Sequence, residues 1–524
     1  MAYPHSGKTG MAMTTAVVPR ATTVVRNTVW NIIGGAVYPV VGMAVVPLMV
    51  RGLGTERYGL WALAGSVLGY FIVFDLGLGR SVTKFVSEAL AKGERGQVPQ
   101  VFWTALLASL ALGTLGGLAF LLAVPFLTSR LLRISPDLAP EARAFLAVFS
   151  AFAPIYLCQR TVGALLEASH RFDLSNAVGV PARVVSLLLP LIGVWLGWPL
   201  AGVGALAILA GVGGLLATFA VALRVRPEVG EGIALSMATL RRVVGFGGWM
   251  MGASILALLV AGSDRVIIGA VLSAKAVAYY APSQSLIGQM YIIPWAMYAT
   301  LFPAFSALWN VDEARAERLY ASAFKILALA MGAIAIMLIV FARDLLTLWL
   351  GPEFAGQSTR VLQVLGVTLF LNTLAWVPST ALQGVGRPDL VAKIFLVETP
   401  FYLGLAVLLT REMGIVGTAL AWAGRSVLDT LLFPVVAWRA TGLSPLIWVA
   451  NSGIKVGMLL GGLAVGMLWV HLILPSQWTL QELGVAAGLV ALFALLGWRF
   501  VLTQEERGAV ARSIPIMKEI QRWL

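Results

Sequence analysis

The sequence predicts an all-α integral membrane protein, and three observations lead to that fold class. Hydrophobic residues make up 59% of the 524 residues and charged residues only 12%, against about 45–50% and about 25% in soluble globular proteins. So little charge cannot cover a soluble fold of this length. The apolar residues also gather in continuous runs of about 20, the length that an α-helix needs to cross a bilayer. These runs lack the alternation of outer-membrane strands, which favours helices over a β-barrel.

Fourteen apolar runs follow one another along the chain, and we expect each to form one transmembrane helix. The first 25 residues are mostly polar, without the short apolar core and cleavage site of a signal peptide, so the first run is expected to be an uncleaved span. No connecting loop is long enough for a catalytic domain. The runs cover about residues 27–49, 58–78, 100–126, 143–168, 175–196, 199–223, 243–263, 278–303, 322–342, 358–383, 390–410, 414–438, 453–473 and 484–502.

The net charge of +13 is explained in part by topology. Most of the 37 Lys and Arg residues fall in segments on the same side as the N-terminus, and the positive-inside rule then places both termini in the cytoplasm. We therefore expect no nucleic-acid partner. The single Cys158 cannot form an internal disulfide, and His5, His170 and His471 are scattered. The sequence predicts neither a metal site nor a cofactor.

Two segments recur along the chain at nearly the same offset. Leu166–Leu174 and Leu382–Leu390 share Leu, Arg, Asp and Leu at identical positions. A weaker echo relates Leu53–Trp61 to Leu272–Tyr280. Each echo relates one span to the sixth span after it. An even number of spans preserves orientation, so the sequence predicts two parallel repeats related by an axis along the membrane normal, as in transporters with a site between their halves.

The repeat divides the chain into six spans, six spans and two further spans. We expect the last segment to form an amphipathic helix on the inner leaflet, because its apolar residues are interleaved with charges at helical spacing. The expected parts are a polar cytoplasmic tail at 1–24, an N-terminal lobe at 25–226, a C-terminal lobe at 240–440, two accessory helices at 450–503 and the amphipathic tail at 504–524.

Several motifs resemble one bacterial family. The stretches Asn31–Gly35, Val46–Leu60 and Phe74–Leu78 resemble the opening of bacterial polysaccharide flippases, and Ser263–Gly269 with Tyr279-Tyr280 resembles the start of their second lobe. These are the O-antigen and exopolysaccharide lipid-carrier flippases of the multidrug/oligosaccharidyl-lipid/polysaccharide exporter superfamily. The resemblance covers about residues 25–440, and fourteen spans is the usual number in that family.

The resemblance implies a fold and an activity. It implies two six-helix lobes in a V around a central cavity, which opens alternately to either side of the bacterial inner membrane. The cargo would be an undecaprenyl-pyrophosphate-linked oligosaccharide, moved to the outer leaflet for lipopolysaccharide or exopolysaccharide biosynthesis. Such a protein is not an enzyme. Its expected partners are this cargo, membrane lipids, and the polymerase and glycosyltransferases of the pathway, and the chain itself is expected to be a monomer.

The candidate site follows from the chemistry of that cargo. In the superfamily the cavity is lined chiefly by the first two spans of each lobe. Arg80 and Arg265 lie there and would offer planar, permanently charged donors to a pyrophosphate. Aromatic rings and amides suit the faces and hydroxyls of sugars, although the rings could instead anchor the helices at the lipid interface. These candidates are Asn31, Tyr38, Trp61, Tyr70, Gln284, Gln289, Tyr291, Trp295 and Tyr298.

Other ionisable residues inside or at the ends of spans are candidates for ion coupling or for structural ion pairs. Arg425 and Asp429 are spaced i, i+4 on one expected helix, where they could neutralise each other. Asp75 and Asp264 lie at the ends of expected spans. Arg160 and Arg183 lie deeper in their spans, and Glu167 could pair with either.

Three other functions stay open. A drug antiporter of the same superfamily would want buried carboxylates for ion coupling, and a cationic, sugar-sized cavity argues against it. A lipid II flippase is a relative whose opening motif this sequence resembles less. A membrane-embedded glycosyltransferase or polymerase would carry catalytic residues on a large outer loop, and the largest one here, at about 127–142, has no paired-carboxylate or nucleophile signature.

Overall fold

The computed structural model describes residues 21–508, apart from 72–74, 253–259, 261, 310, 444–451, 474–479 and 505. Only the backbone is described for 21–36, Leu68, 247–252 and 480–483. Across the described residues, every regular element is a helix. The expected amphipathic tail at 504–524 lies largely outside these residues.

The first half of the chain begins with the long helix α1 and ends with the short 3-10 helix η3. A π-helical turn, η2, extends α4 at its end. The elements are α1 (Ala21–Leu53), α2 (Thr55–Phe71), α3 (Leu78–Ala91), α4 (Gln97–Phe126), η2 (Leu127–Leu131), α5 (Ala139–Phe149), α6 (Phe152–Ala168), α7 (Phe172–Trp195), α8 (Leu200–Val225) and η3 (Pro227–Gly230).

The second half begins with α9 and α11 and ends with two helices that follow the expected repeat. The elements are α9 (Met237–Gly252), α11 (Ser263–Val271), α12 (Ala274–Met290), α13 (Ile292–Leu308), α14 (Glu313–Val340), α15 (Ala342–Leu350), α16 (Pro352–Gly384), α17 (Pro388–Thr441), α19 (Ile454–Ile473), α20 (Leu480–Leu496) and the π-helical turn η5 (Gly497–Val501).

Ten helices in the described part of the chain are long and apolar enough to cross a membrane. The expected all-α membrane fold is therefore confirmed. The 54-residue α17 contains Gly414 in a non-helical conformation (φ 63°, ψ −147°), between the spans expected at 390–410 and 414–438. Three expected spans do not correspond to any of these ten helices. The span at 27–49 falls on α1, that at 58–78 on α2 with α3, and that at 243–263 on α9 with α11. The number of fourteen stays a prediction.

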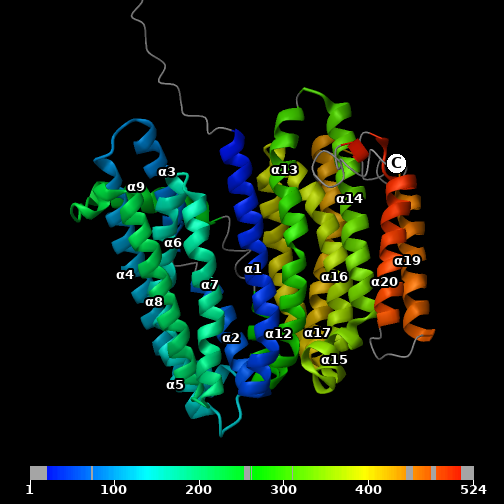
Figure 1. The fold of residues 1–524 in the computed structure, drawn as a ribbon, viewed down its shortest axis with the longest axis horizontal. Helices are drawn as coiled ribbons and strands as arrows, with labels where there is room; N and C mark the ends of the chain where they lie inside the picture. The colour runs from blue at the N-terminus through cyan, green and yellow to red at the C-terminus, as the bar shows by residue number, and fades with distance from the viewer. Residues whose placement is uncertain are drawn as a thin grey trace, which may run out of the picture.

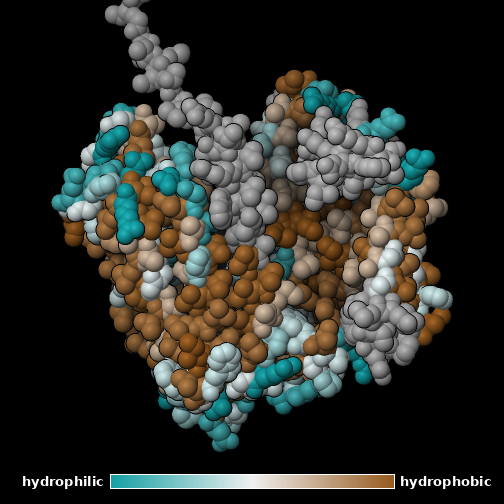
Figure 2. Space-filling view, in the orientation of Figure 1, coloured by the Kyte–Doolittle hydropathy of each residue, from teal (hydrophilic) through white to brown (hydrophobic). Residues whose placement is uncertain are grey.

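The helices form two groups that follow the order of the chain (Figure 1). In the first group α6 packs on α4 and α8, and α8 packs on α7. In the second group α16 packs on α14, α15 and α17, with α19 and α20 beyond α14. The main contact between the groups is that of α2 with α12. Figure 2 shows a broad apolar surface along the helices with polar patches gathered toward their two ends, which is the pattern expected of a lipid-facing surface.

The stronger sequence echo is a repeated turn. α6 ends at Ala168 before α7, and α16 ends at Gly384, the equivalent position of the second copy, before α17. In the first turn the N–H of Arg171 donates to the carbonyl oxygen of Leu166 at 3.0 Å, and in the second the N–H of Arg387 donates to that of Leu382 at 2.9 Å. The same residues therefore close the same connection in both halves.

The Arg and Asp of each turn form the same ion pair. The Nε of Arg171 lies 3.0 Å from Asp173, and that of Arg387 lies 3.1 Å from Asp389. A hydrogen bond from Arg171 lowers the pKa of Asp173, and hydrogen bonds from Arg387 and Lys393 lower the pKa of Asp389. The shared residues thus order the first turn of the following helix in both copies.

The weaker echo marks two equivalent helices that contact each other. α2 and α12 are each 17 residues long, and the offset between their first residues is the one that relates Leu53 to Leu272. At their crossing, a Cβ added to Gly59 would lie 1.8 Å from the carbonyl oxygen of Ala274 and 3.3 Å from the nitrogen of Ala278. Ala278 is the equivalent of Gly59 at this offset. Contact between equivalent positions is what a twofold relation produces at its axis.

Candidate functional site

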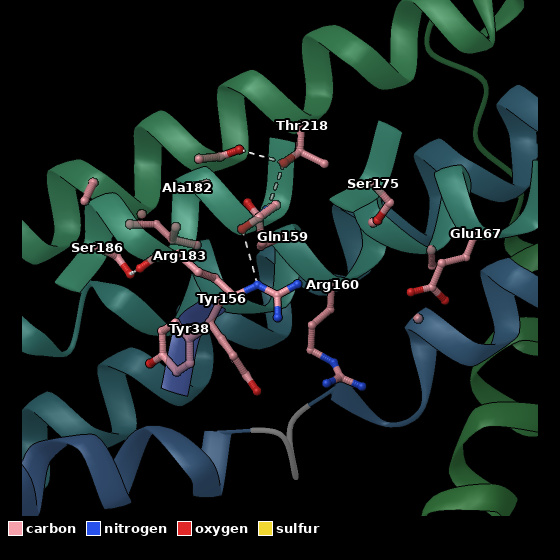
Figure 3. Close-up of a pocket in the computed structure, with 18 of the residues that line it drawn as sticks. Tyr38, Tyr156, Gln159, Arg160, Glu167, Ser175, Ala182, Arg183, Ser186 and Thr218 are labelled. Atoms are coloured by element: carbon pink, nitrogen blue, oxygen red, sulfur yellow. Dashed lines mark hydrogen bonds between the residues drawn. The ribbon is translucent and has the colours of Figure 1, made fainter. Parts of the chain in front are cut away.

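A cavity of about 690 Å³ lies in the first half of the chain, between α1, α3, α6, α7 and α8 (Figure 3). Three arginines line it, Arg80, Arg160 and Arg183, against one lining carboxylate, Glu167. Its uncharged polar lining is Tyr38, Thr83, Tyr156, Gln159, Ser175, Ser186 and Thr218.

Arg80 reaches the cavity because of the helix break before α3. Gly77 caps this helix in the left-handed conformation (φ 68°), which glycine adopts at little cost. The helix is amphipathic: Leu78, Val82 and Phe85 are buried on one face, and Arg80 is exposed. No hydrogen bond or ion pair of the described residues involves the Arg80 side chain, although Arg80 is close enough to Asp75 for its charge to act on that carboxyl group. Its five donors are therefore available to a ligand.

Arg160 is only loosely paired. Its Nε lies 3.7 Å from the Oδ2 of Asp75, which is 2% exposed, and this distance is too long for a charge-assisted hydrogen bond. Among the residues that the structure describes, neither the Nε of Arg160 nor the Oδ1 of Asp75 has a hydrogen-bond partner. The guanidinium of Arg160 can therefore bind an anion without first breaking a strong contact.

Arg183 on α7 and Gln159 on α6 add a donor and an acceptor to the lining of the cavity (Figure 3). Arg183 donates through Nε to the carbonyl oxygen of Gly179 at 3.3 Å, which leaves its terminal nitrogens without a protein acceptor among the described residues. The amide nitrogen of Gln159 donates to Thr218 at 2.9 Å. Its oxygen is buried without a partner, so it can accept from a hydroxyl.

A second cavity of about 240 Å³ adjoins the first and shares Tyr38 with it. It lies between α1, α2 and α12, and its lining includes Trp61, Arg265 and Gln289. The two cavities together run from the interior of the first half to its contact with the second half.

Arg265 is already bonded within the protein. It donates to Ser285 Oγ at 2.9 Å, to the carbonyl oxygen of Ala62 at 3.3 Å and to Gln284. Ala62 lies on α2 and Arg265 on α11, so this side chain joins the two halves. The buried Asp264 accepts from the backbone N–H of Arg265 at 3.0 Å and from Gln284.

An aromatic cluster lies at the junction of α12, α13 and α16. Tyr291 stacks on Trp376 with ring centres 5.7 Å apart, and Trp295 meets Trp376 edge-on at 5.1 Å and Tyr298 at 5.9 Å. Trp295 is 59% exposed. These rings line neither cavity, and Tyr298 donates to Gln383 at 3.2 Å.

The expected pair of Arg425 and Asp429 has a third member. Arg425 lies 4.0 Å from Asp429, but its guanidinium is 2.7 Å from Glu398, in the preceding part of α17. The break at Gly414 folds the two parts of α17 against each other and brings Glu398 to Arg425.

The candidate residues thus fall into separate places. Tyr38 and Arg80 line the larger cavity, while Trp61, Arg265 and Gln289 line the smaller one with Tyr38. The remaining candidates are Gln284, which holds Arg265; Tyr291, Trp295 and Tyr298 in the aromatic cluster; Tyr70, which lines neither cavity; and Asn31, whose side chain is outside the described residues.

Sequence reasoning did not place Arg160, Arg183 and Gln159 in the site. A signal for the two arginines was present, because charged residues deep in a span are functional candidates by default. Gln159 carried no such signal. In the described residues, no three His, Cys, Asp or Glu side chains form a group that could hold a metal ion.

Comparison with known proteins identifies a family and a similar protein. Residues 24–309 match the family model described as "Polysaccharide biosynthesis protein". The chain is 26% identical over 411 residues to the "Putative O-antigen transporter" of Shigella flexneri, covering 78% of this chain and 96% of that protein.

Two solved structures share the fold at a TM-score of 0.65. One is an inward-facing multidrug resistance MATE family transporter of the MOP superfamily, 17% identical, with 80% of this chain and 98% of that chain covered. The other is the lipid II flippase MurJ in an inward closed conformation, 12% identical, with 91% and 99% covered. At these identities the likeness concerns the fold alone.

Proposed function

This chain belongs to the polysaccharide biosynthesis protein family, and on that premise we propose that it is a flippase for lipid-linked oligosaccharides. Its cargo would be a polyprenyl-pyrophosphate-linked glycan, moved from the inner to the outer leaflet by alternating access. The relative named as an O-antigen transporter supports this cargo class. The proposed location is the bacterial inner membrane, with both termini in the cytoplasm.

The arginine-lined cavity is the observation that carries the proposal. Arg80, Arg160 and Arg183 face a single lining carboxylate, Glu167. Arginine recognises phosphate oxygens through two parallel hydrogen bonds and stays charged in an apolar surrounding. The cavity volume of about 690 Å³ falls in the range of about 300–1,000 Å³ typical of small-ligand sites. It suits a pyrophosphate with its first sugar, while the polyprenyl chain stays in lipid.

Tyr38 and Gln159 suit the sugar end of that headgroup. The ring of Tyr38 lies where the two cavities meet, and the free amide oxygen of Gln159 would accept from a sugar hydroxyl. A glycan leaving the larger cavity would therefore pass toward the smaller cavity between the halves.

Contacts between the halves support a two-lobe arrangement closed at one end. The backbone of Arg133 pairs with Gly269 at 2.9 Å and with Ala274 at 3.2 Å, across the halves. The indole of Trp349 donates to the carbonyl oxygen of Met43 at 2.8 Å. These contacts gather at the end where α2 and α12 begin. From the charge distribution along the sequence, we propose that this end faces outward. We propose that this is the inward-facing state, with fourteen spans, lobes at 25–226 and 240–440, and accessory helices at 450–503.

The fold does not distinguish this function from drug export, because a multidrug transporter and the lipid II flippase both share it at a TM-score of 0.65. The charge of the cavity does separate them: a site with three arginines repels cationic drugs and attracts phosphates. A lipid II flippase would use the same pyrophosphate chemistry, so the identity of the sugar distinguishes that function.

The test is deletion of the gene, followed by mass spectrometry of the lipid-linked sugars. We expect a polyprenyl-pyrophosphate oligosaccharide to accumulate and surface glycan to be lost. When expressed in the deletion strain, the Arg160→Gln and Arg183→Gln variants should reach the membrane but fail to restore the surface glycan. The control variant Arg411→Gln, at an exposed arginine of α17, should restore it. A deletion strain with unchanged lipid-linked sugars would refute the proposal.

A further inference from the structure

Two buried carboxyl groups share one arginine inside the second half. Glu398 is 3% exposed and Asp429 is 2% exposed, and both lie within expected spans of α17. Arg425 donates to Glu398 Oε1 through two nitrogens, at 2.9 and 2.7 Å, and lies 4.0 Å from Asp429. One guanidinium balances one carboxylate. If both acids were ionised, the cluster would hold a net negative charge in the interior of the membrane, which is strongly unfavourable.

The hydrogen bonds of the cluster lack one donor. The Oε2 of Glu398 and the Oδ1 of Asp429 are both buried without a partner, although buried carboxylate oxygens are normally satisfied. Both carboxyl groups also face the same guanidinium, which lies 2.7 Å from Glu398 and 4.0 Å from Asp429. An ionised carboxylate only accepts hydrogen bonds, whereas a protonated carboxyl group also donates one. A single proton would therefore remove the excess charge and also supply the missing donor.

No hydrogen bond from another described side chain reaches the two unpartnered carboxyl oxygens. Asn372 on α16 donates to Asp429 at 3.4 Å, a long contact, and Tyr291 donates to Asn372 rather than to an acid. The ring of Tyr402 faces Arg425 at 5.8 Å. Beyond Tyr402, Asp264 is held by Gln284 and by the backbone N–H of Arg265. Among the described residues, the positive charge that pairs with the two acids is that of Arg425.

From this geometry we infer that Glu398 and Asp429 form a binding site for one exchangeable proton in the second half of the chain. The occupant is a proton rather than a metal cation for two reasons. In the part of the chain that the structure describes, only two acidic side chains converge here. The guanidinium of Arg425 lies against them and would repel a cation. A proton needs only a buried carboxyl oxygen without a hydrogen-bond donor, and each of the two acids has one.

The site is connected to the aromatic cluster. The Oδ1 of Asn372 accepts from Tyr291 at 3.0 Å and from Trp376 at 3.2 Å, while its Nδ2 donates to Asp429. Tyr291 is the residue that separates α12 from α13. Protonation makes the carboxyl group of Asp429 a weaker acceptor for the Nδ2 of Asn372. Because Asn372 also accepts from Tyr291, occupancy of the site acts on the break between α12 and α13. This link from proton to helix movement rests on the proposed transport function, but the proton site itself does not.

Infrared difference spectroscopy of the purified full-length protein tests the site directly. Between acidic and alkaline buffer without sodium, we expect one band from a buried protonated carboxyl group. Glu398→Gln and Asp429→Asn should each abolish it, because the remaining acid then forms a neutral pair with Arg425. The control Glu412→Gln, at an exposed acid of the same helix, should keep it. Isotopic labelling of aspartate and glutamate in the unmodified protein assigns the band even if a variant fails to fold.

Three results would overturn the inference: no such band in the unmodified protein, a band that survives both substitutions, or a band that responds to sodium at constant pH. In proteoliposomes with the lipid-linked glycan, a proton gradient should drive accumulation by the unmodified protein, while Glu398→Gln should retain only exchange without accumulation. If the unmodified protein moves no glycan at all, the proposed function fails, and the infrared result still decides the proton site.

Discussion

Replacing Gly59 with alanine should push α2 and α12 apart at their crossing. The added Cβ would lie 1.8 Å from the carbonyl oxygen of Ala274, and because Cβ contacts below 3.0 Å essentially never occur, the two backbones must separate. No rotamer can relieve this overlap, since both atoms are fixed to backbone. Overpacking of this kind costs about 1–3 kcal/mol, and each 1.4 kcal/mol is a factor of about ten in an equilibrium constant. The closed arrangement should therefore lose about 5- to 150-fold in population.

Electron–electron distance measurements between two spin labels provide the assay for Gly59→Ala. The labels replace the exposed Asp137 and Lys275, on opposite sides of the contact between the halves, in a chain whose one cysteine, the buried Cys158, is changed to serine. We expect the short distance of the parent protein to give way to a longer one. Gly69→Ala is the matched control, because a Cβ at this glycine of α2 meets nothing within 4 Å. An unchanged distance distribution in Gly59→Ala would refute the account of this crossing.

Two further predictions concern the repeated turn. His170 lies in the left-handed region (φ 54°), as does the equivalent Gly386 (φ 82°), for which this conformation carries no strain. His170→Gly should therefore raise the thermal midpoint of unfolding by the equivalent of about 1 kcal/mol, and Gly386→His should lower it. A lower midpoint in His170→Gly would contradict the strain argument. The lowered pKa of Asp389 means that its stabilising contribution is present above the unfolded-state pKa and is lost as the pH falls through the folded-state pKa. Asp389→Asn should therefore reduce the thermal midpoint at neutral pH and bring it close to that of the parent protein in acid, and an equal deficit at both pH values would contradict the prediction.

The helical fold and its repeat could be predicted because they depend on local chemistry. Apolar runs of sufficient length give spans whatever their partners. The turn between Leu166 and Asp173 requires the same backbone bond and ion pair as its later copy, so Arg and Asp recur at the same spacing. Gly59 was part of the weaker echo, yet its close approach to Ala274 depends on where two distant helices cross, which one sequence does not reveal.

The candidate site was predicted less completely, because its members converge from distant helices. Arg80, Arg160 and Arg183 lie on α3, α6 and α7, and whether they face one space depends on how each helix is rotated. The i, i+4 rule pointed from Arg425 to Asp429, a local neighbour. It could not identify Glu398, which lies 27 residues away in sequence and meets Arg425 only because α17 folds back at Gly414.

The central claim is that the arginine-lined cavity carries a lipid-linked pyrophosphate glycan across the membrane. Its most direct measurement is the appearance of that glycan in the opposite leaflet of proteoliposomes that contain only the purified protein, detected by an enzyme or lectin confined to that side. We predict translocation by the unmodified protein and by Arg411→Gln, and a rate lower by about tenfold or more for Arg160→Gln and Arg183→Gln, since a lost charge-assisted hydrogen bond is worth about 1.5–3 kcal/mol. Equal rates in all four proteins, or transport of organic cations in place of the glycan, would contradict the claim.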